Sequence, residues 1–538
     1  ELSALKNGLQ ISDRELKKGK TQVPAYRAMY LDSQLKGGDL IKVEKDNAFR
    51  ALIRNMQTME EHKFQIPREQ EKILRGYQKE GFYWIKTLKH NQFGGILADD
   101  MGLGKTLQVI TFLWSEFQKS APGENRRALV ITPASLVFNW MNEIERFAPG
   151  LPATVVTGDV KERKALIKNA GEREVLITSY DLLKRDLKAY QNLDFAVQII
   201  DEAQYIKNHG TQVAKAVKEI RSEFRLALTG TPVENRLSEL WSIFDFLMPG
   251  FLYSYEKFRK EIELPAVQYS NSDAMERLQK MIRPFVLRRL KRDVLKDLPD
   301  KLEKDMFSPL ESEQKELYEA HTERLRLMLG MQSDAEFRTS KLQILAEITR
   351  LRQICCYPGL VYEGYKGNSS KLEMCMELVQ NAVNGGHKLL LFSQFTTMLD
   401  VLAVRLKKAK VSFYMLTGST SKEKRAQMVH AFNEDDTSVF CISLKAGGTG
   451  LNLTAADIVI HYDPWWNLAV QNQATDRAHR IGQQNVVSVY RLFMKDTIEE
   501  RIRALQERKR ELADEILSGE GIGQALISRE EVLELLGR

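Results

Sequence analysis

A glycine-rich segment in the first quarter of the chain has the residue types that bind a nucleotide phosphate. The string DDMGLGKT runs from Asp99 to Thr106, between an apolar stretch at 95–98 and the helical apolar spacing of LQVITFLW. A strand, a glycine-rich turn and a helix form the context in which backbone N–H groups surround an anion. Lys105 would reach the β- and γ-phosphates, and the Thr106 hydroxyl would hold Mg²⁺. Asp99 stands where the strict pattern begins with glycine, so an ordinary glycine-rich turn is the alternative for this string alone.

A second string supplies two carboxylates. The segment FAVQIIDEAQYIKN, residues 195–208, predicts an apolar strand that ends in Asp201 and Glu202. Ligands of α/β sheets bind at the carboxyl ends of the strands. We therefore expect Asp201 to hold Mg²⁺ from the side opposite Thr106, and Glu202 to orient and deprotonate the attacking water. Alone, this acidic pair could be a solvated strand end; together with the upstream loop it predicts an ATPase core.

A third string carries two arginines near the end of the chain. In DPWWNLAVQNQATDRAHRIGQ, residues 463–483, Arg477 and Arg480 are three positions apart, so on a helix they would share a face. A guanidinium group is always charged and can bond two oxygens at once, which suits a phosphoryl group in transfer. A solvated basic helix face is the alternative interpretation.

The elements that must position these residues alternate in type. Strand patterns occur at 128–132, 175–180 and 226–232, and the alternation restarts at 387–395 and continues through 438–450 to 457–463. Strands that alternate with helices predict a parallel sheet with helices on both faces. Between the two series, from about 250 to 345, the strand signal fades, and the charged, leucine-rich sequence predicts helical insertions and a linker.

Composition limits the class of protein. The chain has 538 residues, enough for two or three domains, and its 43% hydrophobic and 28% charged residues exclude a mostly disordered chain. No apolar run approaches the roughly 18–20 residues of a membrane span, and no signal peptide is visible. The four cysteines lack zinc-site spacing, which favours an intracellular compartment: cytoplasm or nucleoid in a prokaryote, nucleus in a eukaryote. The net charge of +7 favours a polyanionic partner. Glu1 in place of Met is what a fragment or a processed chain would show.

In order along residues 70–505, these strings resemble the Swi/Snf family of DNA-translocating ATPases, within the second superfamily of helicases. LRGYQKEGFYW resembles the family's adenine-recognition segment, and LADDMGLGKTLQ its phosphate loop, where aspartate also replaces the first glycine. TPASLVFNW, TSYDLL and TGTPVENRLSELW resemble the next three motifs, and LKAGGTGLNLTAADIVI and DRAHRIGQ the last two. The string DEAQ departs from the more usual Asp-Glu-Ala-His at Gln204, which leaves the strength of coupling between nucleotide and facing lobe open. The chain looks more like the prokaryotic branch.

The resemblance implies a fold class and a set of site residues. The fold would be α/β, with two RecA-like parallel-sheet lobes of the P-loop NTPase type that close on one ATP and its Mg²⁺. Catalytic roles would fall to Lys105, Glu202, Arg477 and Arg480, and the metal ligands would be Thr106 and Asp201. Further nucleotide contacts would come from Gln78, Asp100, Met101, Gly102, Leu103, Gly104, Gly450, Asn452 and Gln473. Small residues and backbone N–H groups would bind DNA phosphates without regard to sequence at Ser135, Ser179, Thr396, Gly418, Lys445, Ala446, Gly447 and Gly448.

The expected domain organisation follows the same motifs. The predicted parts are the end of an upstream N-terminal region at 1–68, an ATP-binding RecA-like lobe at 69–250, helical insertions and an inter-lobe linker at 251–345, a second RecA-like lobe of helicase C-terminal type at 346–500, and a C-terminal helical segment at 501–538.

The function implied is that of a DNA-stimulated ATP hydrolase that translocates on double-stranded DNA and remodels or displaces bound nucleoprotein without strand separation. The expected partners are duplex DNA and a DNA-bound protein complex, with no membrane, and the chain is expected to act as a monomer. One alternative is a strand-separating helicase of the same superfamily, which needs a wedge that the sequence does not reveal. Another is a nucleic-acid-binding scaffold with weak ATPase activity, against which Lys105, Glu202 and Arg480 argue.

Overall fold

The computed structural model describes residues 23–507, except 36–43, 59–63, 119–125, 231–236, 269–271, 296–298, 300, 331–333, 448–450, 466–467, 481 and 505. Contacts divide these residues into two compact units, one up to Leu295 and one after it. Each unit has its own parallel sheet and its own hydrophobic core. The predicted fold class, α/β with two parallel-sheet lobes and helices, is thereby confirmed.

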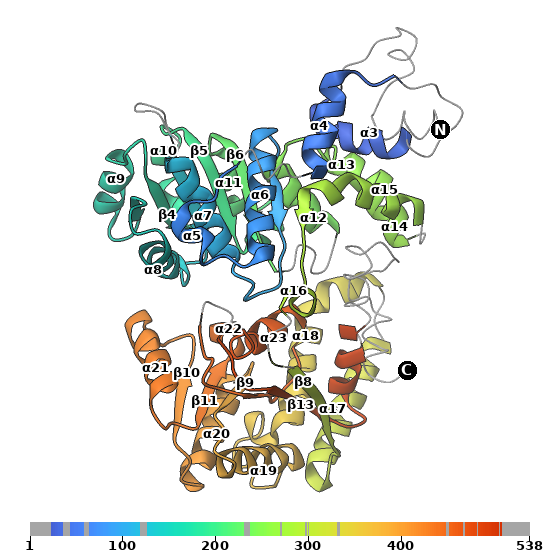
Figure 1. Cartoon of the computed structure of the whole chain (residues 1–538). Helices are drawn as coiled ribbons and strands as arrows, with labels where there is room; N and C mark the ends of the chain where they lie inside the picture. The colour runs from blue at the N-terminus through green and yellow to red at the C-terminus, as the bar shows by residue number, and fades with distance from the viewer. Residues whose placement is uncertain are drawn as a thin grey trace. The chain divides into compact units, whose positions relative to one another are not determined.

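The first unit is built around a seven-stranded sheet in the order β3-β4-β2-β5-β6-β1-β7 (Figure 1). All residues of β1, β2 and β4 are buried, because helices cover both faces of the sheet. Since neighbouring strands are parallel, their carboxyl ends meet along one edge. The strands are β1 (Gly95–Leu97), β2 (Ala128–Thr132), β3 (Ala153–Val155), β4 (Val175–Ser179), β5 (Phe195–Asp201), β6 (Ser222–Leu228) and β7 (Val286–Leu287).

Helices follow the strands of the first unit and pack on the sheet. These helices are α5 (Arg68–Glu71), α6 (Gly76–His90), α7 (Lys105–Gln118), α8 (Val137–Phe147), α9 (Val160–Lys168), α10 (Tyr180–Tyr190), α11 (Gln212–Glu219) and α12 (Leu237–Leu247). A helical group continues the unit with α13 (Tyr255–Phe258), α14 (Leu264–Gln268), α15 (Ser272–Ile282) and α16 (Lys291–Val294).

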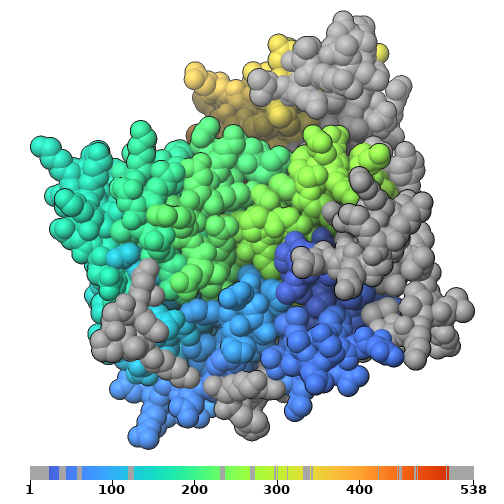
Figure 2. All heavy atoms as spheres, turned by 90° about the horizontal axis from the view of Figure 1, so that it is seen from above, coloured from blue at the N-terminus to red at the C-terminus, as the bar shows by residue number. Residues whose placement is uncertain are grey.

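The N-terminal helices α3 (Ala28–Leu35) and α4 (Asn47–Thr58) belong to the same unit. Figure 2 shows them in dark blue against the light-green helical group, and α3 contacts α15. Arg27, just before α3, is buried, and its guanidinium donates a hydrogen bond to the carbonyl of Phe251 at 2.5 Å and lies over the ring of Tyr253. This buried arginine anchors the N-terminal region to the first unit.

The second unit is built around a six-stranded sheet in the order β10-β11-β9-β12-β13-β8 (Figure 1). Its strands are β8 (Lys301–Ser308), β9 (Leu389–Ser393), β10 (Phe413–Leu416), β11 (Val439–Ser443), β12 (Ile458–His461) and β13 (Val487–Met494). Its helices are α17 (Ser312–Gly330), α18 (Asp334–Cys356), α19 (Ser370–Asn384), α20 (Thr396–Lys408), α21 (Lys422–Glu434), α22 (Leu444–Gly447) and α23 (Leu468–Thr475).

The structure adds strands within the stretch 251–345, which the sequence predicts to be helical. The two residues of β7 pair with β1, and β8 pairs with β13 along its whole length. β8 is an edge strand in which only Ser308 is buried, and its sequence KLEKDMFS lacks the apolar run that marks a buried strand.

Two further features of the described residues bear on the sequence analysis. All four cysteines, Cys355, Cys356, Cys375 and Cys441, are buried and free. Within the part of the chain that the structure describes, none of the helices combines the length and the apolar character that crossing a bilayer requires.

Candidate nucleotide and DNA site

The predicted phosphate loop lies directly after the carboxyl end of β1, between the ends of β6 and β7, and opens into α7 at Lys105. Gly102 and Gly104 have positive φ values of 84° and 75°, a conformation that side-chain-bearing residues rarely adopt. A Cβ atom on Gly104 would also come within 2.5 Å of Gln78 Nε2. The backbone conformation therefore favours glycine at this position, and a side chain here would also have to displace the Gln78 amide.

Lys105 folds back over the loop. Its Nζ donates to the carbonyl oxygen of Asp99 at 2.6 Å and lies 3.4 Å from that of Asp100. Thr106 follows in the first turn of α7 and is half-buried. The lysine charge and the threonine hydroxyl are thus brought together at the amino end of a fourteen-residue helix, where N–H groups favour an anion.

Asp201 is the last residue of β5, at the same edge of the sheet as the loop. Its Oδ2 accepts hydrogen bonds from Trp140 Nε1 at 2.9 Å and Thr132 Oγ1 at 3.2 Å, and its Oδ1 accepts one from the backbone N–H of Glu202 at 2.9 Å. Burial raises the pKa of the Asp201 carboxyl, while the Trp140 hydrogen bond and the charge of Lys105 act in the opposite direction. The three donors are neutral, so an ionised carboxylate here keeps negative charge for a cation. Carboxylate and hydroxyl oxygens are the ligands that Mg²⁺ prefers, and the assignment of Asp201 and Thr106 to this metal stays a prediction.

Glu202 is held in a strained backbone conformation, with φ 51° and ψ 59°. Such left-handed geometry in a non-glycine residue is uncommon and is found preferentially at functional sites. Gln204 Nε2 donates to Glu202 Oε2 at 2.8 Å, and Thr229 Oγ1 donates to Gln204 Oε1 at 3.1 Å. Gln204, where the family more usually has histidine, therefore bridges the predicted base to the loop that follows β6.

Gln78 lies in the first turn of α6 and is 3% exposed. Its Oε1 accepts from the backbone N–H of Arg75 at 2.9 Å, and its Nε2 donates to the carbonyl of Leu103 at 3.0 Å. The hydroxyl of Tyr77 donates to the same carbonyl, also at 3.0 Å. The predicted adenine-recognition segment is therefore hydrogen-bonded to the predicted phosphate loop, and the role of Gln78 in reading the base stays a prediction.

In the second unit the structure corrects the placement of the arginine pair. α23 ends at Thr475, and residues 476–480 continue as turns, so the expectation that Arg477 and Arg480 share a helix face is wrong. The neighbouring segments bind this stretch: Leu453 N donates to the Arg477 carbonyl at 3.1 Å, and the Thr475 hydroxyl lies 2.8 Å from His461 Nε2.

The turn nevertheless places Arg480 beside the segment that contains Asn452. Arg480 Nη1 donates to the carbonyl of Leu451 at 3.3 Å, next to the exposed Asn452. Gln483 Nε2 donates to the carbonyls of Thr454 and Ala456, which precede β12, and to that of Ala478, which lies in the turn after α23. Gln473 is half-buried on α23. Gly450 lies outside the described residues.

The predicted DNA contacts follow the carboxyl ends of strands in both units. Exposed positions are Ser135 after β2, Thr396 after β9 and Gly418 after β10. Ser179 ends β4 but is buried, and its hydroxyl caps α10 by accepting from Leu182 N. In α22, Ala446 is buried, so its side chain is withheld from a ligand. Lys445 and Gly447 belong to the same helix, and Gly448 lies outside the described residues.

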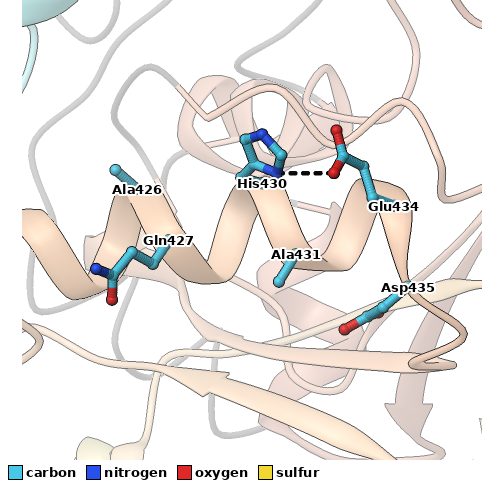
Figure 3. A pocket seen from close by; sticks show the side chains of 6 residues that line it. All are labelled: Ala426, Gln427, His430, Ala431, Glu434 and Asp435. Atoms are coloured by element: carbon cyan, nitrogen blue, oxygen red, sulfur yellow. Dashed lines mark ion pairs between the residues drawn. The ribbon is translucent and has the colours of Figure 1, made fainter.

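A separate hollow of about 650 Å³ lies along one face of α21 in the second unit (Figure 3). It contains none of the predicted site residues. Two of the side chains that line the hollow form an ion pair, His430 Nδ1 with Glu434 Oε2 at 3.1 Å. Both of these side chains are about 70% exposed. The lining is completed by Ala426, Gln427, Ala431 and Asp435. This hollow is therefore an open groove on a solvated helix.

The sequence missed the residues that hold the site residues in place. Trp140 and Thr132 bind Asp201, and Arg289 binds Asp99. Trp140 lies within a string that resembles a family motif, and Arg289 lies within the basic run at 288–292. Neither spacing nor residue type indicated which distant side chain each would reach.

Comparison with known proteins gives a consistent result along the chain. Residues 77–360 match the SNF2-related domain, residues 370–482 the helicase conserved C-terminal domain, and residues 1–67 the bacterial SNF2 helicase associated domain. An uncharacterized ATP-dependent helicase of Mycoplasma pneumoniae is 40% identical over 487 residues, which cover 90% of this chain and 46% of the relative. The putative ATP-dependent helicase/translocase YwqA of Bacillus subtilis is 39% identical, covering 89% of this chain and 53% of the relative.

A solved structure, the Sulfolobus solfataricus SWI2/SNF2 ATPase core in complex with dsDNA, is 38% identical and covers 83% of this chain and 93% of that chain, with a TM-score of 0.41. The chain spans about half the length of the curated relatives it matches. Because the SNF2-related domain alone accounts for more than half of the residues, and the ordered motifs agree with it, the chain belongs to the SNF2 family of ATP-dependent enzymes.

Proposed function

We propose that this chain is a DNA-stimulated ATPase that translocates on double-stranded DNA and remodels or displaces bound nucleoprotein without separating the strands. The observation that carries the proposal is the edge of the first sheet, where Lys105 and Thr106 lie at the start of α7 and a half-buried Asp201 is held by neutral donors beside Glu202. Relatives that are named ATP-dependent helicase or translocase support the use of ATP.

The residues divide the chemistry among them. Lys105 would exchange the carbonyls of its own loop for the β- and γ-phosphates, and Thr106 and Asp201 would hold Mg²⁺. A metal ion held there would supply positive charge against the phosphate oxygens. Glu202 orients the attacking water and accepts its proton, and its bridge through Gln204 to Thr229 fixes its direction. We assign to Arg477 and Arg480 the role of neutralising the charge that develops on the phosphoryl group during transfer.

Duplex DNA is the proposed track. In each unit, predicted contacts follow the carboxyl ends of parallel strands, with Ser135 in the first unit and Thr396 and Gly418 in the second exposed there. Small side chains and backbone N–H groups suit phosphate oxygens and do not read bases, so binding is independent of sequence. The Sulfolobus solfataricus ATPase core, 38% identical in sequence, was solved in complex with dsDNA, which supports this choice.

Steady-state ATP hydrolysis with duplex DNA, single-stranded DNA and no DNA tests the proposal. Duplex DNA should raise kcat, and its effect should fall steeply with salt because phosphate contacts release counterions. The Lys105→Ala variant is the control for contaminating ATPases. Equal rates with and without duplex DNA at low salt would remove the proposed role of DNA.

A second experiment separates translocation from unwinding. The chain should displace the third strand of a triplex in an ATP-dependent reaction, because tracking the backbone needs two units that open and close on phosphates. It should leave a forked duplex intact, because strand separation needs an added wedge. Release of a labelled strand from the fork would favour the strand-separating helicase. We further propose that the chain acts inside the cell. We also propose that it acts as a monomer, and light scattering of the purified chain would check its molar mass.

A further inference from the structure

Asp99 occupies the position at which the strict phosphate-loop pattern has glycine, and its side chain is fully buried. The guanidinium of Arg289, 190 residues later, faces this carboxylate. Arg289 Nε donates to Asp99 Oδ1 at 2.8 Å, and Arg289 Nη2 donates to Asp99 Oδ2 at 2.5 Å. The Arg289 side chain is itself only 10% exposed. The aspartate that replaces glycine therefore forms a buried, bidentate ion pair with Arg289.

The same guanidinium reaches two further elements of the nucleotide site. Its Nη2 donates to Gln108 Oε1 on α7 at 2.8 Å, and its Nη1 donates to the carbonyl of Tyr77 on α6. Gln108 closes the cluster, because its Nε2 lies 3.2 Å from Asp99 Oδ2. One arginine thus joins the phosphate loop, the helix that follows it and the adenine-recognition segment.

The backbone around Arg289 runs alongside the loop. Ala98 N donates to the Leu287 carbonyl at 2.7 Å, and Asp100 N donates to the Arg289 carbonyl at 3.0 Å. In addition, Lys291 N donates a hydrogen bond to Asp100 Oδ2 at 3.0 Å. These contacts extend the pairing of β1 with β7 into the phosphate loop, so residues 287–291 form its outer wall.

Gly81 on α6 shows how tightly the cluster is packed. A Cβ atom there would lie 1.8 Å from Gln108 Oε1 and 2.9 Å from Arg289 Nη2. The absence of a side chain at residue 81 is therefore what leaves room for the guanidinium and the amide.

We propose that Arg289 is a positioning residue for the phosphate loop, and that the Asp99–Arg289 pair holds the loop backbone in the form that receives the nucleotide phosphates. The inference rests on the proposed function, since it assigns a role within the same site. Arg289 would act on the nucleotide through the residues that it holds, Asp99, Gln108 and Tyr77. An Asp side chain fixed by two charge-assisted bonds leaves the loop less freedom than glycine would, which lowers the entropy lost when phosphate binds.

The Arg289→Lys variant tests this role. A lysine ammonium preserves the charge opposite Asp99 but lacks the planar fork that spans Asp99, Gln108 and Tyr77 together. We expect Arg289→Lys to weaken binding of a fluorescent ATP analogue with Mg²⁺, measured without DNA, by about tenfold or more, the loss of one or two charged hydrogen bonds. KM for ATP should rise more than kcat falls.

The matched control is Arg163, which forms a similar buried pair elsewhere in the first unit. Arg163 Nε donates to Asp186 Oδ2 at 2.6 Å and Nη2 donates to Asp186 Oδ1 at 3.0 Å. Arg163→Lys should lower the melting temperature to a similar extent while preserving nucleotide affinity. The double variant Asp99→Asn with Arg289→Gln removes both charges, so it should fold with near-parent stability and still bind the analogue weakly.

The outcomes distinguish this inference from the proposed function. Parent-like affinity in a folded Arg289→Lys variant would overturn the positioning role, and so would an equal loss of affinity in Arg163→Lys, which would point to general destabilisation. A parent chain that fails to bind the analogue would overturn the proposed function itself.

Discussion

The indole Nε1 of Trp140 donates a hydrogen bond to Asp201 Oδ2 at 2.9 Å. Thr132 Oγ1 donates to the same oxygen, and Ser135 lies on the segment between these two donors. The loop with a predicted DNA contact is therefore tied at both ends to the predicted metal ligand. A displacement of this loop by DNA would act directly on the direction in which the carboxylate faces.

Removing the indole donor should weaken Mg²⁺-dependent turnover. Trp140→Phe keeps an aromatic ring in the core and deletes the N–H, so Asp201 loses one of its fixed donors. We expect kcat to fall and the Mg²⁺ concentration for half-maximal ATPase activity to rise, as an Mg²⁺ titration would measure. The control is Trp241→Phe, because Trp241 Nε1 donates to the Tyr253 carbonyl at 3.1 Å, away from the site. An unchanged Mg²⁺ dependence in Trp140→Phe would contradict the prediction.

Variants of the phosphate-loop lysine and of the predicted base should affect ATP binding and ATP hydrolysis differently. Lys105→Ala removes the charge assigned to the β- and γ-phosphates and should abolish turnover and weaken ATP binding. Glu202→Gln keeps the size of the side chain and loses the base, so ATP should bind while hydrolysis stops. Filter binding and a phosphate-release assay measure the two properties. Hydrolysis at the parent rate in Glu202→Gln would show that another group is the base.

Gln204 should matter through its bridge to Glu202. Gln204→Glu replaces the donor with a second carboxylate next to the base, and repulsion should displace Glu202 and reduce kcat without loss of ATP binding. Gln204→His restores the more usual family residue, which can donate and accept through its two ring nitrogens, and should keep most of the turnover. If Gln204→Glu hydrolyses ATP as fast as Gln204→His, the bridge has no role in catalysis.

The arginines of the second unit should act on turnover. Changing Arg477 or Arg480 to alanine should reduce kcat by roughly 10³ to 10⁵, because such a group neutralises charge that develops only during transfer. ATP affinity and DNA affinity should change far less, since ground-state contacts lie mostly with the first unit. Measuring the three quantities separately decides the matter. A loss confined to DNA affinity would assign these arginines to a DNA-contacting surface.

His461 should make the unfolding free energy depend on pH. Burial, with the charge of Arg491, lowers the pKa of the His461 imidazole from 6.5 to about 3. Between these values the unfolded chain binds the proton that the folded chain excludes, so this contribution to the unfolding free energy decreases as pH falls below 6.5. The neutral variant His461→Gln lacks that contribution. From about pH 7 to pH 5, the parent should lose about 2 kcal/mol more than the variant in urea unfolding. Parallel losses would contradict the assignment.

The sequence predicted the parts of this molecule that depend on local pattern. The glycine-rich turn before α7 and the acidic end of β5 have the residue types that their backbone positions require, and the buried runs of β2, β4 and β9 alternate with amphipathic helices. These features are local in the chain, so a window of residues contains the information.

Long-range partners could not be predicted in the same way. Nothing near Arg289 in the sequence indicates Asp99, 190 positions earlier. β8 has charged residues on an exposed edge, so its strand character comes only from its pairing with β13. Similarly, α23 ends at Thr475 because distant backbone and ring groups bind the turn that follows.

The burial of all four cysteines makes the chain suitable for site-specific dye attachment. Burial raises the pKa of each thiol, to about 12 for Cys375, so few thiolates are available to maleimides at neutral pH. New cysteines at exposed positions, such as Val160→Cys on α9 and Val404→Cys on α20, would take up dyes while the native thiols stay unlabelled. Energy transfer between the two dyes would then report the separation of the units as nucleotide and duplex DNA are added, on single molecules and in real time.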